Sequence, residues 1–230
     1  MSESYDMMVI TPHPDDSEFG VAGTVAKWTA QGKKVVYVVC TNGDKGTSDR
    51  SIKPEDLAKT REQEELAAAK TLGVGEVVFL RYPDQSLEDT ADFRKNLVRQ
   101  IRRFKPEVVV TASPYRKYMW HRDHRITGQV ALDAVFPYAR DHLAYPDLLE
   151  EGLEPHKVRE IWLWAEEAPN LRLDVTDTFE TKLQALGCHK SQVGEISPEM
   201  RQRLHDWARV NAEGEDFELG EAFYRVELRY

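Results

Sequence analysis

The sequence of 230 residues contains only two cysteines, Cys40 and Cys188, which form neither a disulfide framework nor the spacing of a metal site. No run approaches the ~18 apolar residues that a membrane-spanning helix needs. The amino terminus also lacks the basic segment and apolar stretch of a secretory signal. A net charge of -9 argues against a general nucleic-acid binder, because such proteins carry basic surfaces. We therefore expect a cytoplasmic protein that binds neither membrane nor nucleic acid.

The chain shows no internal repeat, linker or low-complexity segment, so we expect residues 1–230 to form one domain. Apolar runs alternate with helical patterns, which predicts βαβ units and a mostly parallel sheet. The predicted strands are residues 7–11, 35–41, 76–81, 107–112 and 159–165. Residues 137–157 have no clear period, and we expect a helix and loop there that cover the site or meet another subunit. The tail from Pro198 to Tyr230 is expected to hold an amphipathic helix and to pack on the domain.

A first polar cluster follows the first predicted strand, where His13-Pro14-Asp15-Asp16 precedes a helical pattern. In open α/β sheets, ligands bind at the carboxyl ends of strands. His13 and Asp16 are three residues apart and could close on one ion, since imidazole nitrogen and carboxylate oxygen both suit zinc. Asp15 points elsewhere and could act as a general base toward a metal-bound water. The alternative is a helix N-cap rich in aspartate.

A second cluster, His121-Arg122-Asp123-His124, follows the apolar run Val108–Ala112 and precedes another helical stretch. His121 and His124 have the same spacing as the first pair. Two histidines and one aspartate form a three-ligand set that leaves a position open for water, as a catalytic zinc site requires. The alternative is a pair of solvated histidines on a loop.

With these two motifs roughly a hundred residues apart, the sequence resembles the zinc-dependent deacetylases of the LmbE/PIG-L family, which act on N-acetylglucosaminyl groups. The resemblance continues through most of the chain. It includes Thr41-Asn42-Gly43-Asp44-Lys45-Gly46, Arg61-Glu62-x-Glu64, Tyr82-Pro83-Asp84 and His189-Lys190-Ser191-Gln192. It implies a Rossmann-like three-layer αβα sandwich with a mostly parallel sheet, LmbE-like, and a homo-oligomer, either a trimer or a hexamer.

The resemblance also assigns roles to individual residues. It implies Zn²⁺ ligands at His13, Asp16 and His124, and a general base at Asp15. It implies that His121 is the acid or oxyanion partner, oriented by Asp123. It further implies that Arg61 reaches toward the substrate and that the segment around His189 lies near the active site. From its position alone, His189 is a histidine at a helix C-terminus, favoured by the helix dipole.

Two further segments are candidates for substrate binding. Asp44 lies in a glycine-containing loop at the end of a predicted strand, which we expect to line the substrate site, although a plain turn is the alternative. Tyr118 lies near the position where some relatives have a tyrosine, which Met119 occupies here. The aromatic and arginine-rich stretch from Tyr115 to Arg125 could receive an amino sugar bearing an acidic group. Such residues are equally typical of an oligomer interface.

The predicted activity is hydrolysis of an N-acetyl group on an N-acetylglucosamine-type amino sugar by a water that zinc activates. Fe(II) would accept the same ligands. Two alternatives stay open. One is a different hydrolase on the same metal, such as an amidase of thiol conjugates or a deacetylase of oligosaccharides. The other is a non-catalytic Rossmann-like binding module in which His13 and Asp16 serve as caps.

Overall fold

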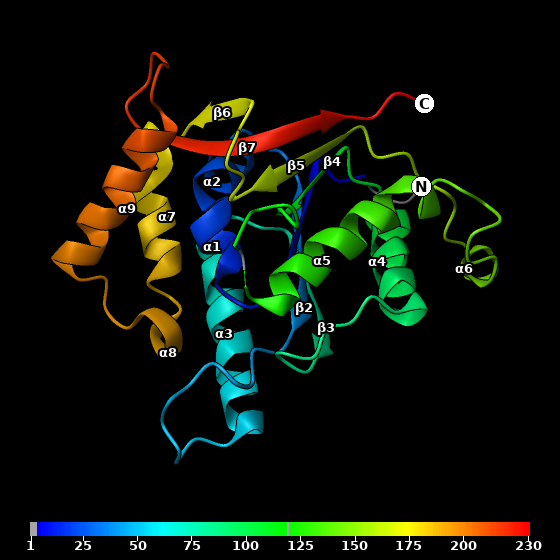
Figure 1. Ribbon diagram of the computed structural model, residues 1–230, viewed down its shortest axis with the longest axis horizontal. Coiled ribbons are helices and arrows are strands. Elements are labelled where there is room, and N and C mark those ends of the chain that lie inside the picture. The colour runs from blue at the N-terminus through cyan, green and yellow to red at the C-terminus, as the bar shows by residue number, and fades with distance from the viewer. Residues whose placement is uncertain (1–3, 119) are drawn as a thin grey trace.

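A single mixed sheet forms the centre of the protein, for which the computed structural model describes residues 4–118 and 120–230 (Figure 1). Among these residues, seven strands lie in the order β3-β2-β1-β4-β5-β7-β6. Five of them pair in parallel: β1 (Met7–Thr11), β2 (Val35–Thr41), β3 (Glu76–Tyr82), β4 (Val108–Ala112) and β5 (Glu160–Trp164). These five are the strands that the sequence predicts, with ends that differ by one residue at most.

The remaining two strands were not predicted. β7 (Gly220–Glu227) pairs antiparallel with β5, and β6 (Leu171–Asp174) pairs antiparallel with β7. The predicted helix of the tail is present as α9 (Pro198–Asn211), but the aromatic residues after it form β7 inside the sheet. In β7, the buried side chain of Phe223 lies between two more exposed neighbours. This alternation is typical of a strand with one covered face.

Helices cover both faces of the sheet. Because successive side chains of a strand point to opposite faces, the apolar residues of one strand pack in two separate cores. Met8 and Ile10 of β1 pack in the core beneath α4 (Ala91–Phe104) and α5 (Arg122–Asp133). Met7 and Val9 pack in the core beneath α2 (Ala22–Ala30), α3 (Pro54–Leu72) and α7 (Phe179–Leu186). Figure 1 shows these two groups of helices on either side of the strands. The predicted three-layer sandwich is confirmed.

Shorter helices complete the chain. They are α1 (Asp16–Gly20), α6 (Asp147–Glu150) and α8 (Lys190–Val193), with a π-helical turn at Ala134–Tyr138 and a 3₁₀ turn at Thr176–Thr178. In the described part of the chain, no helix is both long and apolar enough to cross a membrane.

The position of β1 determines where a ligand can bind. From β1 the chain builds β2 and β3 on one side and then returns to place β4 and β5 on the other. The sheet therefore has its switch point between β1 and β4, where the loops after the two strands diverge and leave a crevice. His13 follows β1 and His121 follows β4, so the fold brings both predicted motifs to this crevice.

Residues 137–157 lie at the end of the sheet opposite to the crevice, so they do not cover it. The guanidinium of Arg102, near the end of α4, donates to the carbonyls of Tyr138, Ala139, Asp141 and Ala144. The imidazole of His156 hydrogen-bonds to the carbonyl of Pro106, 2.7 Å away, just before β4 begins. Because these partners precede β4, the segment packs against the amino ends of the strands.

Candidate metal centre and catalytic site

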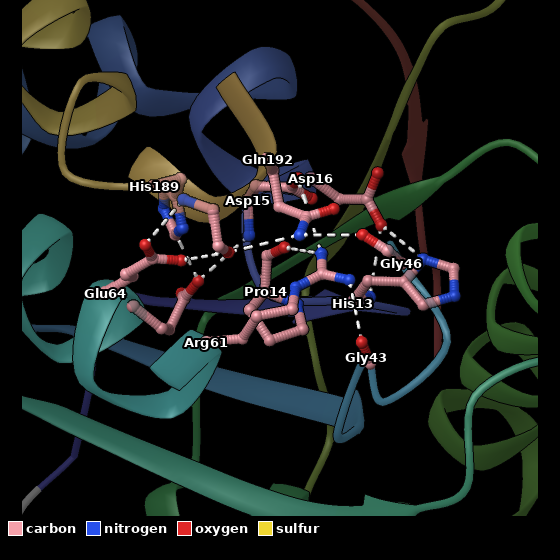
Figure 2. Close-up of polar contacts among 12 residues, drawn as sticks. His13, Pro14, Asp15, Asp16, Gly43, Gly46, Arg61, Glu64, His189 and Gln192 are labelled. Carbon is pink, nitrogen blue, oxygen red and sulfur yellow. Dashed lines mark hydrogen bonds and ion pairs between the residues drawn. The ribbon is translucent and has the colours of Figure 1, made fainter. Parts of the chain in front are cut away.

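His13 is held in the turn between β1 and α1 by the aspartate three residues later. Its Nδ1 lies 2.9 Å from Asp16 Oδ2, and its backbone N–H donates to the same oxygen over 3.1 Å. The side chain of His13 is 8% exposed. The spacing that the sequence shows therefore does bring these two side chains together (Figure 2).

The other nitrogen of His13 faces two more carboxylates. Nε2 lies 3.0 Å from Asp84 Oδ1 and 3.2 Å from Asp123 Oδ2. Asp123 is fully buried and accepts the backbone N–H groups of Gln85 and Leu87. Burial alone would raise the pKa of Asp123, but hydrogen bonds from His13 and the two amides lower it. Asp123 is thus a fixed anion behind His13.

This placement corrects one prediction. Asp123 was expected to orient His121, but among the contacts of the described residues its carboxylate orients His13 instead. The reason is helical geometry, because residues two apart at the start of α5 point to different sides. Asp84, which follows β3 in a turn and which the sequence allowed either to reach the site or to cap that turn, is a second partner of the same imidazole nitrogen.

The two histidines after β4 meet His13 across the crevice. His124 Nε2 lies 3.3 Å from Asp16 Oδ1, so the two oxygens of Asp16 contact one histidine each. The ring centroid of His13 lies 5.3 Å from that of His124 and 4.7 Å from that of His121. One ring nitrogen from each of the three histidines lies within 4.8 Å of the others. Two turns that are a hundred residues apart therefore form one cluster.

The donor atoms of this cluster fit a divalent metal ion. Ligand atoms at ~2.0–2.1 Å from one tetrahedral ion are about 3.4 Å apart, close to the 2.9 and 3.3 Å separations around Asp16. Metal-binding histidines usually donate their other ring N–H to a carboxylate, as His13 can toward Asp84 and Asp123. Burial lowers the pKa of His124, which leaves its imidazole neutral with a lone pair to offer.

The electrostatics of His13 also favour a cation here. Burial by itself would lower the pKa of this imidazole. Hydrogen bonds with Asp123, Asp16 and Asp84 outweigh burial and raise the pKa of His13 to about 11. Three carboxylates around one imidazole thus stabilise a positive charge at this point. A divalent metal ion supplies such a charge, as a proton on the imidazole does.

Asp15 adopts an unusual backbone conformation beside this cluster. Its φ is 99° and its ψ is -27°, in the left-handed region that residues other than glycine seldom occupy. Its N–H donates to Glu65 Oε2 over 3.1 Å, and its Oδ2 lies 3.4 Å from Arg61 Nη2. Burial and the nearby charge of Asp16 raise the pKa of Asp15 to about 8, despite the opposing charge of Arg61.

Arg61 holds the two loops that flank the site. Its guanidinium donates to the carbonyl of Pro14 over 2.6 Å and to that of Gly43 over 3.1 Å. Figure 2 shows the guanidinium directed at these two carbonyls. The side chain is 4% exposed. Arg61 thus contacts the backbone of these two loops, because it lies on the buried side of α3, and its contact with a substrate stays a prediction.

His189 is also buried rather than open to a substrate. Its side chain has no exposed surface, and its Nε2 lies 3.0 Å from Glu18 Oε2 and 3.8 Å from Glu65 Oε2. The sequence missed both glutamates as partners. Glu65 lies among many other charged residues of α3, and the sequence alone gives no sign of its contact with residue 189, far along the chain.

The remaining predicted substrate residues lie in the segments that follow β2 and β4. Asp44 Oδ1 accepts the backbone N–H of Asp84 and lies 3.3 Å from Lys45 Nζ, so it shapes the loop. Tyr118 and Trp120 are 84% and 81% exposed. Their part in substrate binding stays a prediction. The comparison made for Met119 falls outside the described residues.

Histidines and aspartates that can hold a metal lie together at the switch point of a Rossmann-like sheet. This arrangement agrees with the class of protein that the sequence resembles. The chain belongs to the PIG-L family, described as GlcNAc-PI de-N-acetylase, whose profile matches residues 8–135.

Individual relatives support this assignment. The chain is 35% identical over 189 residues to a diacetylchitobiose deacetylase of Thermococcus kodakarensis, which covers 82% of this chain and 70% of the relative. It is 28% identical over 295 residues to a mycothiol S-conjugate amidase of Streptomyces coelicolor, covering 99% and 96%. The solved structure of N,N'-diacetylchitobiose deacetylase from Pyrococcus horikoshii has a TM-score of 0.90 and 32% identity, covering 97% and 84%. The predicted family, and the prediction of an enzyme that hydrolyses amide bonds, are confirmed.

Proposed function

We propose that this protein is a zinc-dependent hydrolase that removes the N-acetyl group from an N-acetylglucosamine-type amino sugar or its conjugate. The observation that carries the proposal is the meeting of His13, Asp16 and His124 next to the carboxylate of Asp15. The relatives are named for deacetylation of diacetylchitobiose and for cleavage of an amide in mycothiol conjugates. Both reactions break a carbon–nitrogen bond with water.

In the mechanism that we propose, His13, Asp16 and His124 would hold the zinc ion, which when bound would supply a Lewis acid for the acyl carbonyl and lower the pKa of the attacking water. Asp15 takes the proton of that water as its oxygen attacks the carbonyl carbon. His121, exposed beside His13, donates a hydrogen bond to the oxyanion that forms. The carbon–nitrogen bond then breaks, a proton passes from Asp15 or His121 to the departing amine, and acetate remains.

The substrate class rests on the relatives and on exposed aromatic residues near His121. Tyr118 and Trp120 are exposed in the segment that leads from β4 to His121. Aromatic rings of this kind stack on the faces of sugar rings. An amide of a thiol conjugate is the second candidate substrate, because the amidase relative aligns with nearly the whole chain.

Release of acetate from a panel of substrates tests the proposal. The purified, zinc-loaded protein is offered N-acetylglucosamine, diacetylchitobiose and a mycothiol S-conjugate, and both acetate and free amine are measured. We expect acetate and amine in equal amounts from at least one N-acetyl sugar. Exclusive cleavage of the thiol conjugate would support the amidase alternative, and no cleavage of any amide would overturn the proposal.

A further inference from the structure

Behind Asp15 lies a buried polar cluster that the proposed mechanism does not use. It consists of Glu18 of α1, Glu65 of α3 and His189 after α7, and none of the three side chains has exposed surface. Ser17 adds a hydroxyl, whose Oγ lies 3.1 Å from Glu18 Oε2 and 3.5 Å from Glu65 Oε1. Residues from three separate elements therefore converge on one point.

A hydrogen bond connects the cluster to the site. Glu65 Oε2 accepts the backbone N–H of Asp15 over 3.1 Å. Asp15 has its φ at 99°, a conformation that an aspartate keeps only when its surroundings hold it there. Since φ relates the direction of the N–H to that of the Cα–Cβ bond, an acceptor fixed at the N–H also sets the direction in which the Asp15 side chain leaves the backbone.

The position of Glu65 is itself determined by its neighbours. Its second oxygen faces the hydroxyl of Ser17, and its Oε2 lies 3.8 Å from His189 Nε2. His189 is in turn held by Glu18, 3.0 Å away. Arg61, one helical turn before Glu65, holds the carbonyl of Pro14. Two side chains of α3 thus hold the carbonyl oxygen and the N–H of one peptide group, the one that joins Pro14 to Asp15.

We propose that Glu65 is a positioning residue for the general base: its carboxylate holds the Asp15 amide, and thereby the Asp15 carboxylate, in the reactive arrangement. The proposal rests on the role that the proposed function gives to Asp15. Glu18 and His189 keep the Glu65 carboxylate in place and do not contact the substrate.

Two substitutions at residue 65 and one control separate this role from general stability. Glu65→Gln keeps an oxygen of the same shape for the Asp15 amide, whereas Glu65→Leu removes it and still fills the space. The control is Glu64→Leu, which removes the hydrogen bonds that Ser191 donates from its N–H and hydroxyl over 2.7 and 2.6 Å and leaves the carboxylate of Glu65 in place.

We expect Glu65→Leu to lower kcat by ~10–100-fold, since misplacing a reacting group by about 1 Å has an effect of this size. KM and zinc content should stay near their original values, Glu65→Gln should retain most of kcat, and Glu64→Leu should leave kcat unchanged. In an Asp15→Asn background, Glu65→Leu should cause no further loss, because it acts only through Asp15. Equal losses in both backgrounds, or equal losses for Glu65→Gln and Glu65→Leu, would overturn the proposal.

Hydrogen exchange at the Asp15 amide gives a readout that does not depend on catalysis. We expect slow exchange in the original protein and in Glu65→Gln, and fast exchange in Glu65→Leu. If Glu65→Leu does not fold, Glu65→Met replaces it, because its flexible side chain fills irregular space. A protein that cleaves no amide while Asp15 shows this exchange pattern would refute the proposed function alone. Unchanged exchange in the Leu or Met variant would refute the role of Glu65.

Discussion

Replacing Asp15 by asparagine is the most specific test of the proposed chemistry. The substitution keeps the local structure, because asparagine tolerates positive φ better than most residues. Its N–H can still donate to Glu65, and its side-chain oxygen can still face Arg61. The change removes only the negative charge and the ability to take a proton from water.

The expected loss follows from the size of general-base catalysis, which contributes ~10²–10⁴-fold to the rate. We predict that Asp15→Asn lowers kcat by about 100-fold or more, or about 2.7 kcal/mol in activation free energy. Burial and Asp16 raise the pKa of Asp15 to about 8 in the metal-free protein. A divalent ion nearby stabilises the ionised form, so that Asp15 is deprotonated at neutral pH when zinc is bound.

The assay measures acetate release and zinc stoichiometry on the same samples. Activity of the original protein should fall as the pH drops through the pKa of Asp15, because only the ionised carboxylate accepts a proton. This acidic limb should be absent in the residual activity of Asp15→Asn. Near-original turnover at full zinc content would refute the assignment of Asp15 as the base.

Three other predictions concern the metal and the charges around it. His13→Ala and His124→Ala should each lower zinc content at a fixed low zinc concentration, and unchanged stoichiometry by elemental analysis would contradict their assignment as ligands. Asp123→Asn should weaken zinc affinity ~10–100-fold by loosening His13, as a chelator competition would measure; an effect on kcat alone would support the earlier expectation that Asp123 orients His121. The stability of the metal-free protein should fall from about pH 5 to pH 8, because burial raises the pKa of Glu18 and of Glu65 to about 8, above their ordinary value of 4.5. Over that range the folded state binds more protons than the unfolded state, so that deprotonation favours unfolding; a melting temperature that rises steadily over that range would contradict the burial of both carboxyls.

The parallel part of the fold was predictable because its strands are continuous apolar runs covered on both faces. β1 and β2 are buried along their entire length, which is typical of strands in a doubly covered sheet. β6 and β7 were missed because neither is a continuous apolar run: β6 reads Leu-Arg-Leu-Asp, and β7 mixes buried with exposed residues. Their strand conformation depends on pairing with distant segments, which local preference does not reveal.

The site was predictable where its residues are close in sequence and missed where they are not. His13 and Asp16 meet through the geometry of one turn, and both motifs follow strands that adjoin the switch point. Arg61 and Glu65 look like surface charges of a helix, since nothing in the spacing shows that their partners are a distant turn and His189. The direction of Asp123 depends on the rotation of α5 about its axis, which a motif does not specify.

Some expectations have not been tested. The extent of one domain over residues 1–230, a cytoplasmic location and assembly into a trimer or hexamer all stay predictions. Light scattering on the purified protein measures the last of these directly. An apolar groove between α5 and the strands β5 and β7, lined by exposed Phe136 and Tyr224, is a surface that such an assembly could cover.

The central claim is that one metal ion lies between the turns that follow β1 and β4. Anomalous diffraction at the zinc edge, from crystals grown with zinc, tests it most directly. We predict a single strong peak ~2.0–2.2 Å from one atom each of His13, Asp16 and His124. A peak between Glu18, Glu65 and His189 instead, or no peak near His13 at full zinc occupancy, would contradict the claim.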